Sequence, residues 1–285
     1  MSSSDRTGTD LWGADDNAAR YEEFARLHPG YRETSRDLVT LASPASDATV
    51  LDLACGTGAT TAEILSVLGP DGKVVAVDKS PAMLKVAASS VRDPRVQWLQ
   101  ASAEDVDRHL SEPVHVAICN SAIWQTDLAA TASAVRSVLA TGGRFVFNIG
   151  SGFLEPLDDA NQLGDLPGVM RAIAARDYGW APAVRTASAA RPRPRLSRET
   201  VCHWLSEAGF EIERVEQLSY ERTPEAQHAW LAVPIFTTMY LPGLPYLERM
   251  RVLDKAYAHL GGGETQIGRW VAFVATAAPR RSDSA

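Results

Sequence analysis

The stretch LDLACGTG, residues 51–58, decides the fold. It continues an apolar run that begins at Thr49, and its two glycines, Gly56 and Gly58, precede a segment with helical character. Glycine lets a backbone turn sharply and approach a ligand closely, and the N-terminus of a helix favours a negatively charged group. The stretch therefore predicts a strand, a ligand-binding turn and a helix. A dinucleotide-binding turn would have a third glycine at position 61, where Thr61 stands, and this weakens that alternative.

A second apolar segment, residues 73–77, ends at Asp78, which lies 20 positions after Gly58. A carboxylate at the end of the second strand can accept hydrogen bonds from both hydroxyls of a ribose. NAD and S-adenosylmethionine share that ribose, so Asp78 does not separate the two ligands. Ser80 and Pro81 then predict the cap and the first turn of the next helix.

The alternation of apolar strands and helices continues along the chain. Strands of nearly continuous apolar residues, separated by helices, indicate a parallel sheet that is covered on both faces and wound with right-handed crossovers. We therefore predict an α/β fold with a doubly wound, mostly parallel, seven-stranded Rossmann-like sheet, whose ligands bind at the carboxyl ends of the strands. The predicted strands are 49–54, 73–77, 96–100, 114–119, 144–149, 210–219 and 269–277.

Two insertions and a helical cap accompany the predicted sheet. One or two helices are expected over residues 15–43, with a break near His28-Pro29-Gly30. Asp127 and Ser197 are predicted to cap later helices. The predicted organisation is a tail and helical cap (1–48), a cofactor-binding core (49–150), an insertion or lid (151–196), a core helix and strand (197–219), a second insertion or lid (220–268) and a final strand with a tail (269–285).

Two finer predictions concern side-chain burial. Within the helix that follows Ser197, we expect Val201, Trp204, Leu205 and Ala208 to face inward. His115 lies inside a predicted strand and is expected to be packed.

The composition narrows the class of protein. The chain has 285 residues and a formal net charge of −7, whereas nucleic-acid binding usually needs a basic surface that neutralises phosphates. There is no apolar run of about 18 residues and no apolar signal core, so we expect no membrane span and a cytoplasmic location. Cys55, Cys119 and Cys202 lack metal-ligand spacing, so no metal site is expected.

Four segments in order carry a resemblance to a known family: LDLACGTG (51–58), VVAVDKSPAML (74–84), ASAEDVD (101–107) and VAICNSAIW (116–124). They resemble the motifs of class I S-adenosylmethionine-dependent methyltransferases, in particular the small-molecule branch that includes quinone and natural-product enzymes. The resemblance is clear over residues 49–150 and weaker in the sheet elements after 196.

This resemblance implies S-adenosylmethionine as the cofactor and S-adenosylhomocysteine as its product. Asp78 would hold the ribose, and Ser102, which stands where the family usually has an aspartate, would accept hydrogen bonds from the adenine without charge assistance. Ala54 replaces a common glycine. The implied cofactor-binding residues are Tyr21, Asp52, Ala54, Gly56, Thr57, Gly58, Asp78, Lys79, Met83, Ser102, Ala103, Glu104, Asn120 and Ser121.

The acceptor side has weaker signals. Candidate catalytic residues are His28, Tyr31 and His228; the alternative for Tyr21 and Tyr31 is that they pack a helix against the core. The two insertions are rich in aromatic residues, which suit a lid over a hydrophobic acceptor, with ordinary core packing or a dimer contact as the alternative. The predicted substrate-binding residues are Trp124, Tyr178, Trp180, Trp230 and Tyr240.

The predicted function is transfer of the sulfonium methyl group to a nucleophilic oxygen, carbon or nitrogen of a small, hydrophobic or aromatic metabolite. Natural-product metabolism, including antibiotic biosynthesis, or quinone metabolism is the expected setting. The partner is a small molecule, neither nucleic acid nor membrane is expected, and a homodimer is compatible with the sequence. Two alternatives remain open: a methyltransferase-fold enzyme that keeps S-adenosylmethionine but catalyses a non-methylating cyclisation, and a cofactor-binding regulatory subunit.

Overall fold

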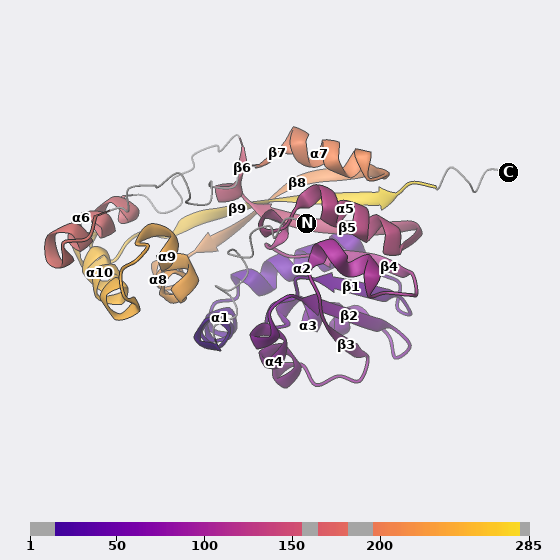
Figure 1. The fold of residues 1–285 in the computed structure, drawn as a ribbon, viewed down its shortest axis with the longest axis horizontal. Helices are drawn as coiled ribbons and strands as arrows, with labels where there is room; N and C mark the ends of the chain where they lie inside the picture. Colours follow the sequence, from indigo (N-terminus) through magenta and orange to yellow (C-terminus); the bar gives the residue numbers. More distant parts are fainter. Residues whose placement is uncertain (1–14, 156–164, 182–195, 280–285) are drawn as a thin grey trace, which may run out of the picture. The chain divides into compact units, whose positions relative to one another are not determined.

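The computed structural model describes residues 15–155, 165–181 and 196–279 (Figure 1). Contacts within the chain divide it into two compact units, which we describe separately. The sheet unit comprises residues 29–157, 195–219 and 269–285, and the helical unit comprises residues 1–28, 158–194 and 220–268.

A seven-stranded sheet with the order β3-β2-β1-β4-β5-β9-β8 forms the centre of the sheet unit. The pairs β1–β2, β1–β4, β2–β3 and β4–β5 are parallel, and β9 runs antiparallel to β5. The predicted mostly parallel sheet is therefore confirmed. The strands are β1 (Thr49–Leu53), β2 (Lys73–Asp78), β3 (Val96–Gln100), β4 (Val114–Cys119), β5 (Leu139–Gly150), β8 (Phe210–Arg222) and β9 (Gln266–Ala277); β6 (Leu154–Glu155) and β7 (Leu196–Ser197) form a separate parallel pair.

Apolar side chains cover both faces of this sheet. Alternate strand residues enter two different clusters: Leu51 packs in one and Val50 in the other. The cluster around Leu51 includes residues of α5 (Leu128–Val138) and α7 (Arg198–Glu207), and the cluster around Val50 includes residues of α2 (Gly30–Ala42) and α3 (Ala59–Val67). Burial on both faces explains why the strands read as continuous apolar runs. The remaining helices of this unit are α4 (Pro81–Ser90) and the 3₁₀ helices η1 (Ala103–Arg108), η2 (Ile123–Gln125) and η3 (Ser151–Phe153).

The helix starts agree with the predicted caps. The side chains of Ser80, Asp127 and Ser197 each accept a hydrogen bond from the amide three residues later, at 3.3, 3.1 and 3.0 Å. The predicted break near residues 28–30 is also present, since α1 ends at Leu27 and α2 begins at Gly30.

Two burial predictions were wrong. Trp204 is 38% exposed, whereas Val201 and Leu205 are fully buried. The two buried residues define the inner face of α7, and Trp204 lies beside that face with its ring 5.0 Å from the ring of His203. His115 is exposed because it is the second residue of β4, and the strand is continuously buried only from Val116 onward.

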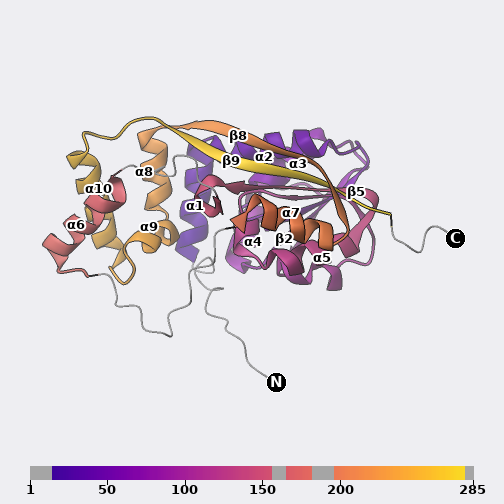
Figure 2. The same cartoon turned by 90° about the horizontal axis from the view of Figure 1, so that it is seen from above.

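In the described part of the helical unit, the chain forms the helices α1, α6, α8, α9 and α10 (Figure 2). One cluster of buried apolar residues joins α6, α8, α10 and the C-terminal end of α9. It includes Met170, Leu231, Leu241 and Leu253. The helices are α1 (Asp15–Leu27), α6 (Leu166–Tyr178), α8 (Pro224–Ala232), α9 (Pro234–Tyr240) and α10 (Tyr246–His259).

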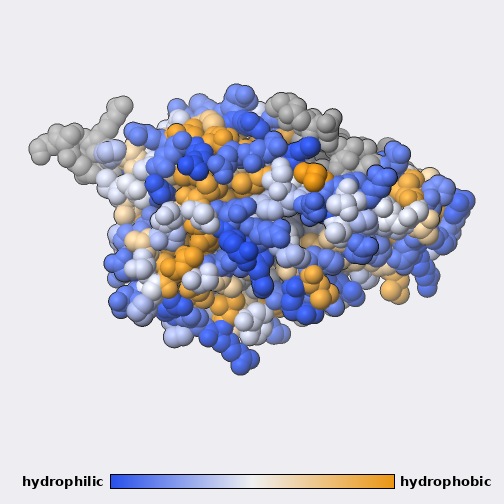
Figure 3. Space-filling model, turned by 180° about the vertical axis from the view of Figure 1, so that it is seen from behind, coloured by the Kyte–Doolittle hydropathy of each residue, from blue (hydrophilic) through white to orange (hydrophobic). Residues whose placement is uncertain are grey.

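The surface combines hydrophilic residues with separate hydrophobic patches (Figure 3). Within the described residues, no helix combines the length and the apolar character that a membrane crossing requires.

Candidate functional site

The turn that follows β1 has an unusual backbone. Ala54, Gly56 and Gly58 all have positive φ angles, of 56°, 56° and 90°. The amide of Cys55 between them donates to the carbonyl of Val77 in β2, at 2.9 Å, which ties the turn to the neighbouring strand. Left-handed backbone is favourable for glycine and costly for alanine, so Ala54 holds a conformation that its side chain disfavours.

Asp78 ends β2 and faces this turn. Its Oδ2 accepts a hydrogen bond from the amide of Gly56 at 2.9 Å, and its Oδ1 accepts one from the amide of Ser80 at 2.8 Å. Burial raises the pKa of Asp78, and the hydrogen bonds from Ser80 and Gly56 oppose that rise. A carboxylate has about four acceptor sites, so two backbone bonds leave capacity for a pair of hydroxyl groups.

A second carboxylate lies beneath the turn. Asp52 is 1% exposed, and its Oδ2 accepts a hydrogen bond from the hydroxyl of Thr61 at 2.5 Å. Burial, together with the nearby charge of Asp78, raises the pKa of Asp52 to about 7, against the effect of Thr61. Asp52 therefore binds a proton far more readily than an exposed aspartate does.

A polar network lies at the carboxyl ends of β4 and β5. The Asn120 amide donates to the hydroxyls of Thr34 (3.0 Å) and Ser35 (2.8 Å), and its Oδ1 accepts from the Asn148 amide at 2.9 Å. Asn148 in turn accepts from the backbone of Ser121, at 2.6 Å. Other members of the network are Thr60, whose hydroxyl lies 2.9 Å from that of Ser35, and Trp270, whose indole donates to Ser121 at 3.0 Å.

Comparison with known proteins identifies this arrangement. The model of the methyltransferase domain family matches residues 50–143, which contain the turn, Asp78 and the end of β4. The ubiquinone/menaquinone biosynthesis C-methyltransferase UbiE of Proteus mirabilis is 31% identical over 181 residues, which are 60% of this chain and 67% of that protein. The chain belongs to the class I S-adenosylmethionine-dependent methyltransferases. It is therefore an enzyme of this family, with S-adenosylmethionine as its cofactor, and the predicted family is confirmed.

Other similarities agree with this methyltransferase family. The malonyl-(acyl-carrier protein) O-methyltransferase of Acetivibrio thermocellus is 27% identical over 133 residues, and the match spans 46% of this chain and 46% of that protein. The YcgJ protein of Bacillus subtilis has a TM-score of 0.55 at 16% identity and covers 87% of this chain and 99% of its own. The cyclase SpnF also has a TM-score of 0.55, at 14% identity, covering 87% of this chain and 81% of its own. The two structural likenesses concern the fold.

The residues of this methyltransferase fit the cofactor at the glycine turn. A Cβ atom built on Gly56 meets no atom of the described residues within 4 Å, so among these residues the space beside Gly56 is open to a ligand. Two buried oxygens near the turn, Asp52 Oδ1 and Thr57 Oγ1, have no hydrogen-bond partner within the described residues. Gly58 differs, because a Cβ there would lie 3.3 Å from Val91 and 3.4 Å from Ala87, so its role is close packing of the turn.

The remaining predicted cofactor residues of the sheet unit have varied surroundings. The Ser102 hydroxyl donates to Asp105 at 2.9 Å, which leaves its oxygen able to accept. Glu104 accepts the amide of Asp127 at 2.8 Å, so this carboxylate supports the start of α5. Met83 and Ala103 are buried, and Lys79 is half-buried beside Asp78.

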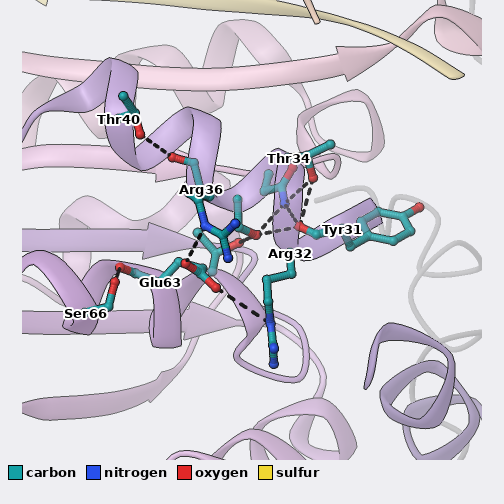
Figure 4. Close-up of polar contacts among 10 residues, drawn as sticks. Tyr31, Arg32, Thr34, Arg36, Thr40, Glu63 and Ser66 are labelled. Atoms are coloured by element: carbon teal, nitrogen blue, oxygen red, sulfur yellow. Dashed lines mark hydrogen bonds and ion pairs between the residues drawn. The ribbon is translucent and has the colours of Figure 1, made fainter. Parts of the chain in front are cut away.

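Tyr31 contributes its backbone to the polar network. Its carbonyl accepts hydrogen bonds from the hydroxyls of Thr34 and Ser35 and from Asn120, at 2.9, 2.8 and 3.3 Å. Its ring extends away from these contacts (Figure 4). The same helix is joined to α3 by Glu63, which pairs with Arg32 and Arg36. Tyr31 thus has a fixed backbone and a side chain that points elsewhere.

The aromatic residues predicted for substrate binding fall into two groups. In the sheet unit, Trp124 stacks on Phe153 with ring centroids 3.7 Å apart and donates its indole N–H to the Ser121 carbonyl at 3.0 Å. In the helical unit, the other four pack against its apolar cluster and are partly buried: Tyr178, Trp180, Trp230 and Tyr240.

The candidate bases of the helical unit have different partners. Nε2 of His228 lies 2.9 Å from Asp254 Oδ1, and its ring meets that of Tyr257 edge-on at 4.9 Å. His28 stacks on Phe24 at 5.5 Å, and Tyr21 lies 6.3 Å from the same ring.

Sequence reasoning missed part of the site. One network joins Asn120 and Ser121 to four residues that were not predicted from the sequence: Ser35, Thr60, Asn148 and Trp270. One signal was available, since Asn148 is a polar residue within the apolar strand RFVFNIG and is fully buried. A buried amide needs partners, so such a residue indicates a polar network.

Proposed function

We propose that this chain transfers the sulfonium methyl group of S-adenosylmethionine to a nucleophilic oxygen, carbon or nitrogen of a small, hydrophobic or aromatic metabolite. The observation that carries the proposal is the pairing of Asp78, held by two backbone amides, with the open left-handed turn at Gly56. When bound, the cofactor supplies a methyl group that its cationic sulfur has already activated. The protein's task is then to position the reactants and exclude water, and positioning alone can contribute about 7–11 kcal/mol.

The cofactor site in this proposal lies along the carboxyl ends of β1, β2, β3 and β4. Ala54, Gly56 and Gly58 would line the methionine part, and the Asp78 carboxylate would accept the ribose hydroxyls. Lys79 and Met83 would flank the ribose and adenine, Ser102 and Ala103 would border the adenine, and Asn120 and Ser121 would lie beside the sulfonium. The orientation of Asn120 supports its place here, because three hydrogen bonds to α2 hold its amide.

The acceptor is proposed to bind aromatic residues of the two insertions and Trp124. Among the candidate bases, His228 has a supporting contact, since a hydrogen bond with Asp254 can hold its ring in one tautomer and orientation. A base is needed only if the acceptor must lose a proton, and it would then contribute about 10²–10⁴-fold. The relation to UbiE, a C-methyltransferase of quinone biosynthesis, supports quinone-like acceptors; natural-product acceptors and a cytoplasmic location belong to the same proposal.

A labelled-methyl assay tests this function. The full chain is incubated with methyl-labelled S-adenosylmethionine and a panel of phenols, enols, amines and quinols, and label transfer is followed together with product mass. A gain of one methylene unit in the acceptor supports methyl transfer. A product of unchanged mass would instead support the cyclisation alternative, and failure to bind the cofactor by calorimetry would contradict both.

A further inference from the structure

Arg249 is a buried cation in the helical unit. It lies in α10, is 8% exposed, and its Nη1 donates to the hydroxyl of Thr238. Its Nε is buried and has no acceptor within the described residues. Among those residues no carboxylate lies within ion-pair distance of Arg249, although other cations of this unit, such as Lys255, do have acidic partners.

The neighbours of Arg249 do not replace a counter-ion. The ring of Tyr246 lies 5.6 Å from its guanidinium carbon, and a second guanidinium, that of Arg20, lies 4.8 Å from the same ring. Two positive charges therefore flank one aromatic ring. A ring face attracts a cation, but it carries no net charge, and the second cation adds repulsion.

A buried guanidinium without an anion is an unfavourable arrangement. Burial lowers the pKa of Arg249, yet arginine stays charged at any physiological pH. A charge removed from water is normally compensated by an opposite charge, and uncompensated cases are rare. A ligand that brings an anion to Arg249 would supply the opposite charge that the described residues lack.

The hydrogen bonds of Arg249 define which group would fit. Nη1 donates to Thr238, whereas Nε has no acceptor among the described residues, so the edge of the guanidinium formed by Nε and Nη2 lacks a partner there. That edge presents two parallel N–H donors, which match the two oxygens of a planar carboxylate. The same edge can bind a phosphate through two N–H donors, so a carboxylate and a phosphate must be compared by experiment.

We propose that Arg249, with Arg20 and Tyr246, forms a binding site for the carboxylate of a small organic acid. The Nε–Nη2 edge of Arg249 binds the two oxygens, and Arg20 adds a second positive charge. The site rests on the proposed function in one respect only: it assigns this carboxylate to the methyl acceptor. Binding of a carboxylate to Arg249 can be measured without any methyl transfer.

The test uses benzoate as the carboxylate, benzamide as its neutral isostere and inorganic phosphate as a different anion. Thermal unfolding of the full chain is followed with increasing concentrations of each compound. We expect benzoate to raise the unfolding temperature and benzamide to leave it unchanged, with benzoate at least tenfold more effective than phosphate. Stabilisation by phosphate equal to or above that by benzoate, or equal stabilisation by benzamide, would overturn the carboxylate assignment.

Arg249→Met is the decisive variant, and Arg251→Met is its matched control. Arg251 lies on the same helix but is exposed, so both changes remove one positive charge from α10. We expect Arg249→Met to lose the benzoate response and to unfold at an equal or higher temperature without ligand, because it removes an uncompensated buried charge. Arg251→Met should keep the response. If Arg249 were only structural, its variant would unfold at a lower temperature and still respond to benzoate.

A third readout separates this site from the cofactor site. Calorimetric titration with S-adenosylhomocysteine should give the same affinity for the wild type and Arg249→Met. In methyl transfer, the wild type should use an aromatic acid with a lower KM than its amide, and Arg249→Met should lose that preference. Failure of cofactor binding in the wild type would contradict the proposed function while leaving the benzoate result interpretable.

Discussion

The sheet unit and the helical unit treat a buried charge in opposite ways. In the sheet unit, both oxygens of Asp78 are held by backbone amides, those of Gly56 and Ser80. In the helical unit, the polar contacts of Arg249 with described residues are a hydrogen bond to the neutral hydroxyl of Thr238 and the ring of Tyr246. Backbone amides come from the fold itself, so Asp78 is fixed before any ligand arrives. The fold itself thus supplies the partners of Asp78, whereas the described residues leave Arg249 without an opposite charge.

The largest expected effect concerns the raised pKa of Asp52, a buried acid of the sheet unit. The pKa of Asp52 is raised from 3.8 to about 7, so the folded state binds a proton that the unfolded state releases. The stabilisation of the folded state by the proton on Asp52 is fully present below pH 3.8 and is lost as the pH rises through about 7. At about 1.4 kcal/mol per pH unit, the free energy of unfolding falls by at most about 4 kcal/mol.

Denaturant unfolding of the wild type and of Asp52→Asn at several pH values measures this effect. Asparagine keeps an acceptor for Thr61 but has no charge, so the variant should gain stability relative to the wild type between pH 4 and pH 7. Asp107→Asn, at an exposed position, serves as the control. If the difference in the free energy of unfolding between the wild type and Asp52→Asn stayed constant with pH, the raised pKa of Asp52 would be contradicted.

Asp78→Ala should weaken cofactor binding by about 1–3 kcal/mol, as expected for hydrogen bonds to a charged group. Calorimetry with S-adenosylhomocysteine gives the affinity directly. Because the variant also deprives two amides of their acceptor, its folding is checked by circular dichroism, and Asp78→Asn, which keeps one acceptor oxygen, should lie between it and the wild type. Unaltered affinity in a folded Asp78→Ala would exclude Asp78 from the cofactor site.

Gly56 and Gly142 form a matched pair for the glycine turn. Their φ angles are 56° and 74°, and a Cβ atom on either meets nothing within 4 Å. Alanine at either position should therefore destabilise the fold by a similar amount, about 1 kcal/mol. Only Gly56→Ala should also weaken binding of S-adenosylhomocysteine, because only that Cβ would enter the ligand space. Equal affinities in the two variants would contradict the proposed location of the methionine part.

The smallest expected effect concerns the helical unit. The indole N–H of Trp180 donates to the Pro242 carbonyl at 3.0 Å, and Trp180→Phe removes this bond at a cost of about 1 kcal/mol in the free energy of unfolding. Cofactor affinity should stay the same. If Trp180→Phe stays folded under assay conditions and still has a higher KM for the acceptor, the result would favour a direct role of Trp180 in substrate binding.

Local signals made much of the sheet unit predictable. The turn at 51–58, the acid at Asp78 and the caps Ser80, Asp127 and Ser197 each depend on residues close together in the sequence. Such features follow from short-range chemistry, in which a given residue type suits one backbone conformation. The alternation of strands and helices, with right-handed crossovers, then predicted the doubly wound and mostly parallel character of the sheet, although not the order of its strands.

The features that the sequence did not reveal depend on distant residues. Asn120 meets Ser35 across 85 positions, and Trp270 meets Ser121 across 149. The burial of Arg249 was not predicted, because arginine is rarely buried without an opposite charge, yet it lies among the buried residues of α10. The exposure of Trp204 shows the converse, since apolar character does not fix which flank of a helix faces the core.

The second insertion leaves and rejoins the sheet through neighbouring strands, because β8 and β9 pair with each other. Its two ends thus meet the sheet side by side, and the length of chain between them has only a weak effect on the entropy of closing that loop. A different helical segment could be grafted between Arg222 and Gln266 without rethreading any strand. If the insertion binds the acceptor as proposed, exchanging it between related enzymes should change the preferred acceptor and leave the strand order of the sheet unaltered.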